Sequence, residues 1–142
     1  MSYLLDTCVL SECVKKLPNP LINQWFNQQL PEQLFLSGIT LAELRKGIYK
    51  IESSQPERHK KLQDWLYTIE VKFYLRILPV NSNVLNIWAK LSADAELQGK
   101  KLAVMDSLIA ATALEFNLVL VTRNSSDFEY TSVKQMNPWQ TL

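Results

Sequence analysis

The chain has 142 residues, 47% hydrophobic and 20% charged, a composition that fits one compact globular domain and leaves little room for two. Fifteen Lys and Arg against 14 Asp and Glu give a formal charge of +1, so net charge alone indicates no polyanionic partner. One histidine, two cysteines and three glycines exclude histidine or cysteine zinc sites, disulfide scaffolds and glycine-rich nucleotide loops, which leaves carboxylates as the main candidates for catalysis.

The first half of the chain alternates short apolar runs with segments of helical periodicity. A strand is predicted over Tyr3–Leu5 and ends at Asp6. Short helices are expected over residues 9–14 and 20–30, and a second strand over residues 33–37. Thr40 then opens a helix whose apolar residues recur at spacings of three and four.

The second half continues the same alternation. Pro56 opens a further amphipathic helix, followed by a short strand over residues 76–80 and a helix that ends near Gly99. The helix that begins at Asp106 is apolar nearly all round, which predicts that it is buried. Strands are predicted over residues 118–122 and 132–136, so the fold class is α/β with a mostly parallel central sheet.

Nothing in the sequence divides the chain or directs it to a membrane. It has no internal repeat, linker or low-complexity segment, so we expect one domain over residues 1–142. No run approaches the roughly 18 apolar residues that cross a bilayer. The N-terminal segment lacks the basic region and cleavage site of a secretory signal. We therefore expect a cytoplasmic protein without membrane contact.

Four acidic residues differ from the others because each interrupts or closes an apolar element. In an open parallel sheet, strand C-termini and helix N-termini share one edge, which is where ligands bind. Asp6 and Asp127 follow predicted strands, and Glu43 and Asp106 lie in the first turns of predicted helices. We call this set the acidic edge; it consists of Asp6, Glu43, Asp106 and Asp127.

Convergence of the acidic edge implies a cation. Two carboxylates ~4 Å apart repel by about 4 kcal/mol at an effective dielectric constant of 20. A site made of oxygen ligands alone suits Mg²⁺ or Mn²⁺, which can activate water and stabilise a phosphoryl transition state.

Each of these acids also has an ordinary structural interpretation. Asp6 can turn the chain through an Asx bond, and Asp106 is a natural helix N-cap. Thr40 and Glu43 have the spacing of a capping box, and Asp127 can cap a short helix. For each acid taken singly, the structural interpretation is at least as good as a catalytic one. Four independent structural roles that converge on one sheet edge are nevertheless a weaker hypothesis than a single functional site.

At these residues the sequence resembles the PIN-domain ribonucleases, specifically the VapC-type toxins of bacterial toxin–antitoxin pairs. The matching stretches run through the chain in the family's order and approximate spacing: Tyr3-Leu4-Leu5-Asp6-Thr7, Thr40-Leu41-Ala42-Glu43-Leu44-Arg45-Lys46-Gly47, Asp106-Ser107-Leu108-Ile109-Ala110-Ala111-Thr112-Ala113, Val121-Thr122-Arg123-Asn124-Ser125-Ser126-Asp127-Phe128 and Asn137-Pro138-Trp139. One departure is Cys8, where the family commonly has asparagine, so the chain lacks that amide beside Asp6.

The resemblance implies a three-layer α/β/α domain that binds Mg²⁺ or Mn²⁺ and cleaves RNA. The acidic edge matches the family's four acidic positions, with Asp6 and Asp106 as the principal metal ligands and Glu43 and Asp127 assisting. Supporting polar groups are expected at Thr7, Thr122 and Asn124. A metal-held water would attack the phosphodiester in line and leave a 5′-phosphate and a 3′-hydroxyl.

The same resemblance implies partners. An antitoxin protein would bind near the short helix that carries Trp25 and Phe26, and the protein would form a homodimer. The RNA target suggested by the family is a structured RNA such as tRNA. For RNA phosphates, the sequence offers a local basic strip near Glu43 and one basic residue after the strand over residues 118–122; the candidate contacts are Arg45, Lys46 and Arg123.

Other functions fit less well. A phosphatase of the haloacid dehalogenase type needs a second Asp two residues after the first, and position 8 is Cys. A phospho-receiver domain needs an acidic pair near Asp6, which is missing. The remaining alternative is a catalytically weakened PIN-like domain that binds RNA or protein without cutting, and the four retained carboxylates argue against it.

Overall fold

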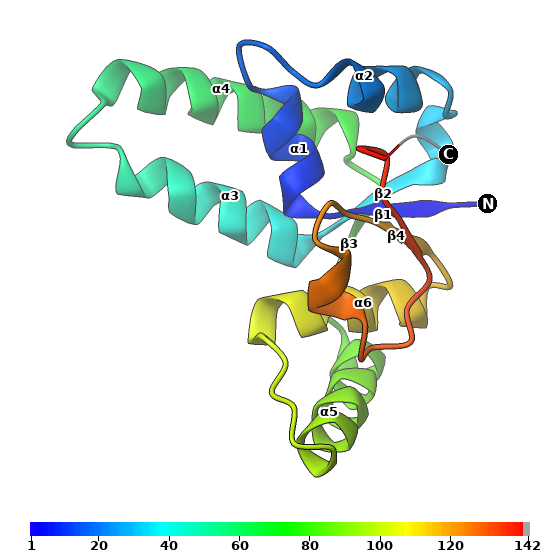
Figure 1. Ribbon diagram of the computed structural model, residues 1–142. Coiled ribbons are helices and arrows are strands. Elements are labelled where there is room, and N and C mark those ends of the chain that lie inside the picture. Colours follow the sequence, from blue (N-terminus) through cyan, green and yellow to red (C-terminus); the bar gives the residue numbers. More distant parts are fainter. Residues whose placement is uncertain (141–142) are drawn as a thin grey trace.

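The central layer is a sheet of five short strands, each an apolar run of two to four residues (Figure 1). The computed structural model describes residues 1–140. Its strands are β1 Tyr3–Leu5, β2 Leu34–Ser37, β3 Ile77–Leu78, β4 Val119–Val121 and β5 Gln135–Met136. They lie in the order β3-β2-β1-β4-β5, and every neighbouring pair is parallel. The predicted, mostly parallel sheet is therefore confirmed.

Helices cover both faces of this sheet. They are α1 Thr7–Cys13, α2 Pro20–Asn27, α3 Gly38–Lys50, α4 Pro56–Lys72, α5 Ser82–Leu97 and α6 Val104–Glu115, with short 3₁₀ helices η1 Pro31–Gln33 and η2 Ser125–Phe128. Helices α1 to α4 lie on one face, and α5 and α6 lie on the other (Figure 1). The resulting three-layer α/β/α arrangement is the one that the resemblance implies.

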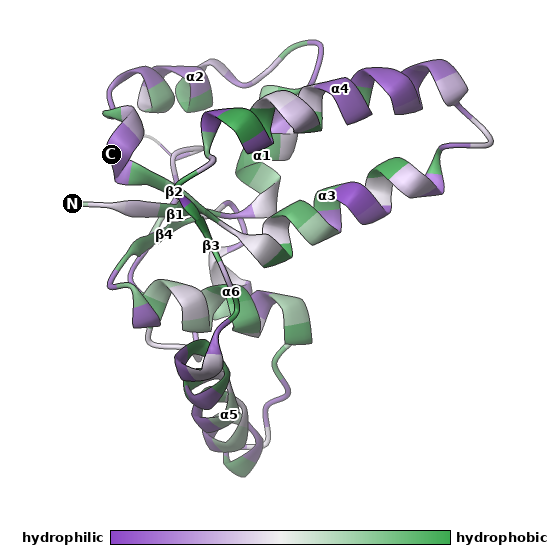
Figure 2. Cartoon of the chain, turned by 180° about the vertical axis from the view of Figure 1, so that it is seen from behind, coloured by the Kyte–Doolittle hydropathy of each residue, from purple (hydrophilic) through white to green (hydrophobic). Residues whose placement is uncertain are grey.

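The two faces of the sheet have separate cores because successive side chains of a strand point to opposite sides. Leu5 and Val121 pack with α1 to α4, whereas Leu4 and Leu120 pack with α6. Helix α6 and the strands are mostly apolar, and the part of α4 farthest from the sheet is mostly hydrophilic (Figure 2). The predicted burial of α6 is confirmed, since six of its residues are buried.

Two helix starts differ from the sequence prediction. Helix α3 begins at Gly38 rather than at Thr40, because the Ser37 side chain accepts a hydrogen bond from Ile39 N and caps the helix. Helix α6 begins at Val104 rather than at Asp106, and its N-cap Ala103 provides no side-chain bond. Within residues 1–140, no helix is long and apolar enough to cross a membrane.

Candidate active site

Asp6 leaves the C-terminal end of β1 and is almost completely buried, with 4% of its surface exposed. Its backbone N–H donates to the Val121 carbonyl at 2.9 Å, which continues the pairing of β1 with β4. Its Oδ1 accepts from Thr7 N at 2.8 Å and so caps α1. Asp6 therefore has a structural role, but as the N-cap of α1 rather than in the expected Asx bond, and this role fixes the carboxylate at the sheet edge.

Thr122 gives Asp6 a second donor from the neighbouring strand. It directly follows β4 and is completely buried, and its Oγ1 donates to Asp6 Oδ2 at 2.7 Å. The same hydroxyl oxygen accepts from Asn124 N at 3.0 Å. Thr122 thus orients the carboxylate and also shapes the loop that leads to Asp127.

Glu43 lies in the second turn of α3, one turn later than predicted, because the helix begins at Gly38. Its Oε1 accepts a hydrogen bond of 2.7 Å from Thr7 Oγ1. The capping-box interpretation of Thr40 and Glu43 is wrong, since Ser37 caps α3 and Thr40 is buried inside the helix. The Thr7 hydroxyl instead aims Glu43 toward the neighbourhood of Asp6.

Asp106 is the third residue of α6 and is half-buried. It is not the N-cap of the helix, so that alternative is also wrong. Burial and, in decreasing order, the charges of Asp6, Asp127 and Glu43 together raise the pKa of the Asp106 carboxyl to about 6. All four members of the acidic edge therefore share one electrostatic environment, as the sheet topology predicts.

Asp127 approaches from the loop after β4. It is exposed and lies inside η2, where its backbone N–H donates to the Asn124 carbonyl at 3.0 Å. Asn124 is the N-cap of η2, but its side chain does not cap it. Asp127 is therefore not the N-cap of η2. The exposed side-chain amide of Asn124 makes no capping hydrogen bond to this helix.

The donor chemistry of the acidic edge fits a hard divalent cation, because its ligands are oxygens and a cation relieves the repulsion acting on Asp106. Within residues 1–140, however, no group of three or more acidic, histidine or cysteine side chains is close enough to hold an ion together. Mg²⁺ commonly takes one or two protein carboxylates and keeps several waters. The arrangement thus suits two direct carboxylates, with the others acting at longer range.

Cys8 fills the position where the family commonly has asparagine. Its thiol donates to Asp6 Oδ2 at 3.6 Å, and its sulfur accepts from Arg123 N at 3.4 Å. Burial raises the pKa of this thiol to about 11, and the charge of Asp6 acts in the same direction. The protonated thiol is therefore a hydrogen-bonding spacer between β1 and the loop after β4 rather than a nucleophile.

The three expected phosphate contacts have different environments. Arg45 on α3 forms an ion pair with Glu70 on α4, which occupies its guanidinium. Lys46 is exposed and lines a shallow depression together with Arg45 and Lys50. Arg123 is exposed beside the acidic edge, with its guanidinium carbon 5.7 Å from the centre of the Trp139 ring.

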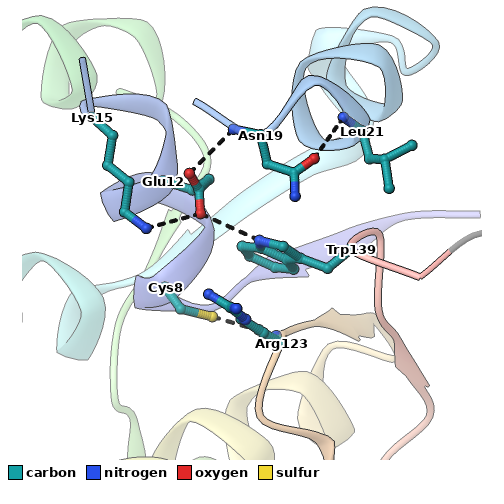
Figure 3. A network of polar contacts seen from close by, with 7 residues as sticks. All are labelled: Cys8, Glu12, Lys15, Asn19, Leu21, Arg123 and Trp139. Carbon is teal, nitrogen blue, oxygen red and sulfur yellow. Dashed lines mark hydrogen bonds and ion pairs between the residues drawn. The ribbon is translucent and has the colours of Figure 1, made fainter. Parts of the chain in front are cut away.

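Reasoning from the sequence alone missed Glu12 and the position of Trp139. Glu12 is buried on α1, and its carboxylate accepts bonds from Lys15, Asn19 and Trp139 (Figure 3). A signal for Glu12 existed, because an acid stands within the mainly apolar segment around Leu10. The sequence gives no comparable signal for its partner Trp139, which is 127 positions away.

The two aromatic residues on α2 lie near β1, as expected, but they differ in exposure. Trp25 is 6% exposed and packs edge-on against Tyr3 and Phe26. It therefore belongs to the core, and of the two residues expected near an antitoxin only Phe26 is partly exposed.

Comparison with known proteins gives consistent matches over almost the whole chain. The family model of the PIN domain matches residues 3–134. Toxin FitB of Neisseria gonorrhoeae is 35% identical over 138 residues, which cover 96% of this chain and 97% of that protein. The VapC ribonuclease Y4jK of Sinorhizobium fredii is 36% identical over 139 residues, with coverage of 96% and 97%.

The solved structures agree with the sequence relatives. The crystal structure of FitAcB from Neisseria gonorrhoeae superposes with a TM-score of 0.90 at 35% identity. The match covers 98% of this chain and 99% of that one, so the similarity extends from β1 through the C-terminal segment.

Proposed function

This chain belongs to the PIN domain family, and from that premise we propose that it is a metal-dependent endoribonuclease and the toxin of a toxin–antitoxin pair. The observation that carries the proposal is the gathering of the acidic edge: Thr7 contacts both Asp6 and Glu43, and the charges of Asp6, Asp127 and Glu43 add to burial in raising the pKa of Asp106. Carboxylates from β1, α3, α6 and η2 would not be gathered against their mutual repulsion for stability alone.

In this proposal, Asp6 and Asp106 hold Mg²⁺ or Mn²⁺, and Glu43 and Asp127 act at longer range. Bound there, the cation would lower the pKa of a water ligand and offset charge on the phosphoryl oxygens. Thr122 and Thr7 keep the carboxylates of Asp6 and Glu43 aimed by bonds of 2.7 Å each. These bonds are made before substrate arrives, so little reorganisation is needed during the reaction.

The proposed biological setting follows from the relatives. One relative is named a toxin and another a VapC ribonuclease. A nuclease that attacks the RNA of its own cell needs an inhibitor, so we propose a cognate antitoxin as protein partner and a structured RNA such as tRNA as substrate. We propose a homodimer on the same family grounds.

One observation favours a second candidate. Because no three acidic side chains within the described part of the chain are close enough to hold an ion together, a PIN-like domain that binds RNA or protein without cutting is the alternative. The two candidates differ in one result: the alternative retains RNA binding but gives no metal-dependent product.

The test is incubation of the purified, antitoxin-free protein with total RNA in Mg²⁺, in Mn²⁺ and in EDTA. We expect discrete fragments with either metal and none in EDTA. Asp106→Asn should abolish them, whereas Asp94→Asn, a matched change at an exposed residue of α5 that pairs with Lys90, should not. Unchanged RNA at micromolar protein in both metals would overturn the proposal.

A further inference from the structure

The C-terminal segment returns to helix α1, and Trp139 makes the contact. Its Nε1 donates to Glu12 Oε1 at 3.3 Å (Figure 3). The Glu12 carboxylate also accepts from Lys15 Nζ at 3.1 Å and from Asn19 N at 3.2 Å. With 5% of its surface exposed, Glu12 is a buried acid whose donors come from the segment between α1 and α2 and from the C-terminal segment.

The charge of Glu12 is maintained by these donors. Burial raises the pKa of Glu12, but the bonds from Lys15, from the Asn19 backbone and from Trp139 together bring the pKa below its usual range. The carboxylate is thus ionised at neutral pH, and an ionised acceptor makes a stronger bond to the indole N–H than a neutral one does. Trp139 is thereby fixed in orientation as well as in position.

The Trp139 ring in turn contacts the Arg123 side chain. The guanidinium carbon of Arg123 lies 5.7 Å from the centre of the indole ring, within cation–π range (Figure 3). The backbone N–H of the same residue donates to Cys8 Sγ at 3.4 Å. Arg123 is therefore held at both its backbone and its side chain, although it is exposed to solvent.

Arg123 lies close to Asp6 of the acidic edge in the hydrogen-bond network. Arg123 directly follows Thr122, the donor to Asp6, and Cys8 links its backbone to Asp6 as well. Arg45 is paired with Glu70, whereas no Asp or Glu side chain in residues 1–140 forms an ion pair with Arg123. Arg123 thus lies in the loop beside Thr122 and Asp6, and its guanidinium has no acidic partner among the described residues at an edge whose carboxylates would otherwise repel a phosphate.

We infer that Glu12 and Trp139 are positioning residues that hold Arg123 as a phosphate-binding cation at the mouth of the acidic edge. The ligand is a phosphodiester of the RNA substrate, so the inference rests on the proposed function. The planar guanidinium matches two phosphate oxygens at once. Because the indole ring already restrains it, less side-chain entropy is lost on binding.

The test measures binding separately from cleavage. A fluorescein-labelled single-stranded RNA oligonucleotide is titrated with the Asp106→Asn protein in Mg²⁺ at several KCl concentrations, and fluorescence anisotropy gives Kd. Adding Arg123→Ala should weaken binding by at least about threefold and reduce the slope of log Kd against log salt by about one. The matched control Arg58→Ala, an exposed arginine of α4, should change neither quantity.

The positioning residues are tested in the same assay. Trp139→Leu and Glu12→Gln should weaken binding in the same direction as Arg123→Ala, and neither should weaken it further once Arg123 is alanine. Trp139→Phe keeps an aromatic ring and guards against a folding defect, and thermal unfolding of every variant is recorded. A structural role alone would lower Tm and leave the salt slope unchanged.

The results separate the inference from the proposed function. If the parent protein cuts RNA but Arg123→Ala binds with unchanged Kd and salt slope, the inference is overturned and the nuclease stands. The inference also fails if Trp139→Leu weakens binding equally with and without Arg123. If binding depends on Arg123 and Trp139 but no cleavage occurs, the nuclease fails and the phosphate site stands.

Discussion

Thr122 Oγ1 donates a hydrogen bond of 2.7 Å to Asp6 Oδ2, and it joins residues that are 116 positions apart. Both side chains are buried, at the adjoining ends of β4 and β1. A buried carboxylate with fixed donors has one preferred orientation, whereas an exposed carboxylate has many. Because β1 and β4 pair, this bond can form, and it gives the Asp6 carboxylate a defined position.

Replacing Thr122 with valine leaves the side-chain volume nearly unchanged but removes the hydroxyl. The variant therefore loses the hydrogen bond donated to Asp6 and the one accepted from Asn124 N. We expect the free energy of unfolding to fall by about 1–3 kcal/mol, because the buried Asp6 carboxylate loses a hydrogen-bond donor. We also expect RNA cleavage to slow. Thr122→Ser should retain both properties. Thr112→Val, at a buried hydroxyl inside α6, is the matched control and should leave cleavage unchanged. Parental cleavage by Thr122→Val would refute this role for Thr122.

Thr7 should matter for activity more than for stability. Its hydroxyl donates the hydrogen bond that orients Glu43, and the residue is half-buried. Thr7→Val therefore removes an orienting hydrogen bond and little core packing. Bonds that orient metal-site carboxylates are typically worth 10–100-fold, so we expect the cleavage rate or the Mn²⁺ affinity to fall by about tenfold. Thr7→Ser should restore it. Equal rates for the valine variant and its parent would show that Glu43 does not need this bond.

Asp106 should destabilise the metal-free protein at neutral pH. Its pKa is raised to about 6, against about 4 in an unfolded chain. Between these values the unfolded chain has released a proton that the native state retains, so native stability falls as pH rises through the window. Asp106→Asn should therefore raise Tm at pH 7.5 by about 2–4 °C, which corresponds to about 1 kcal/mol after solvent screening.

The gain from Asp106→Asn should be much smaller near pH 4, where the native carboxyl is protonated and the unfolded one is about half protonated. Thermal unfolding in EDTA at the two pH values measures it, with Asp94→Asn as the exposed control on α5. A gain of the same size at both pH values would mean that charge repulsion at the acidic edge is not its cause.

The Cys8 thiol should react slowly in the native protein. Its pKa of about 11 leaves very little thiolate at pH 7.5, and burial also raises the pKa of Cys13. We expect iodoacetamide to label both thiols much faster after unfolding in guanidinium, as followed by mass spectrometry. Cys8→Ala should still cleave RNA. Rapid native labelling of Cys8 that abolishes cleavage would contradict its assignment as a spacer.

The sheet and the shared environment of the acidic edge were predictable for a topological reason. Where parallel strands end, the following residues gather at one edge whatever their side chains, so Asp6 and Asp106 could be brought together from the order of elements alone. The start of α3 was not predictable, because Ser37 and Thr40 are both good capping residues. The choice depended on Thr40 being completely buried, which is a tertiary property.

The contact between Glu12 and Trp139 illustrates the other limit of sequence-based prediction. Each residue has an ordinary local interpretation, as an acid on a short helix and as an aromatic near the end of the chain. Their bond depends on β5 placing the C-terminal segment beside β4, from which it reaches back to α1. No local pattern encodes a pairing over 127 positions, and the geometry of the fold was needed to find it.

The central claim, that the acidic edge acts as one nuclease site, is tested most directly by a double-mutant cycle. Single-turnover cleavage of a labelled RNA in Mn²⁺ is measured for the parent, Asp6→Asn, Asp106→Asn and the double variant. Residues that act as a unit give non-additive losses, so each single change should cost at least about 100-fold and the double variant should be no slower than the slower single one. Multiplicative losses, or cleavage that survives either single change, would contradict the claim.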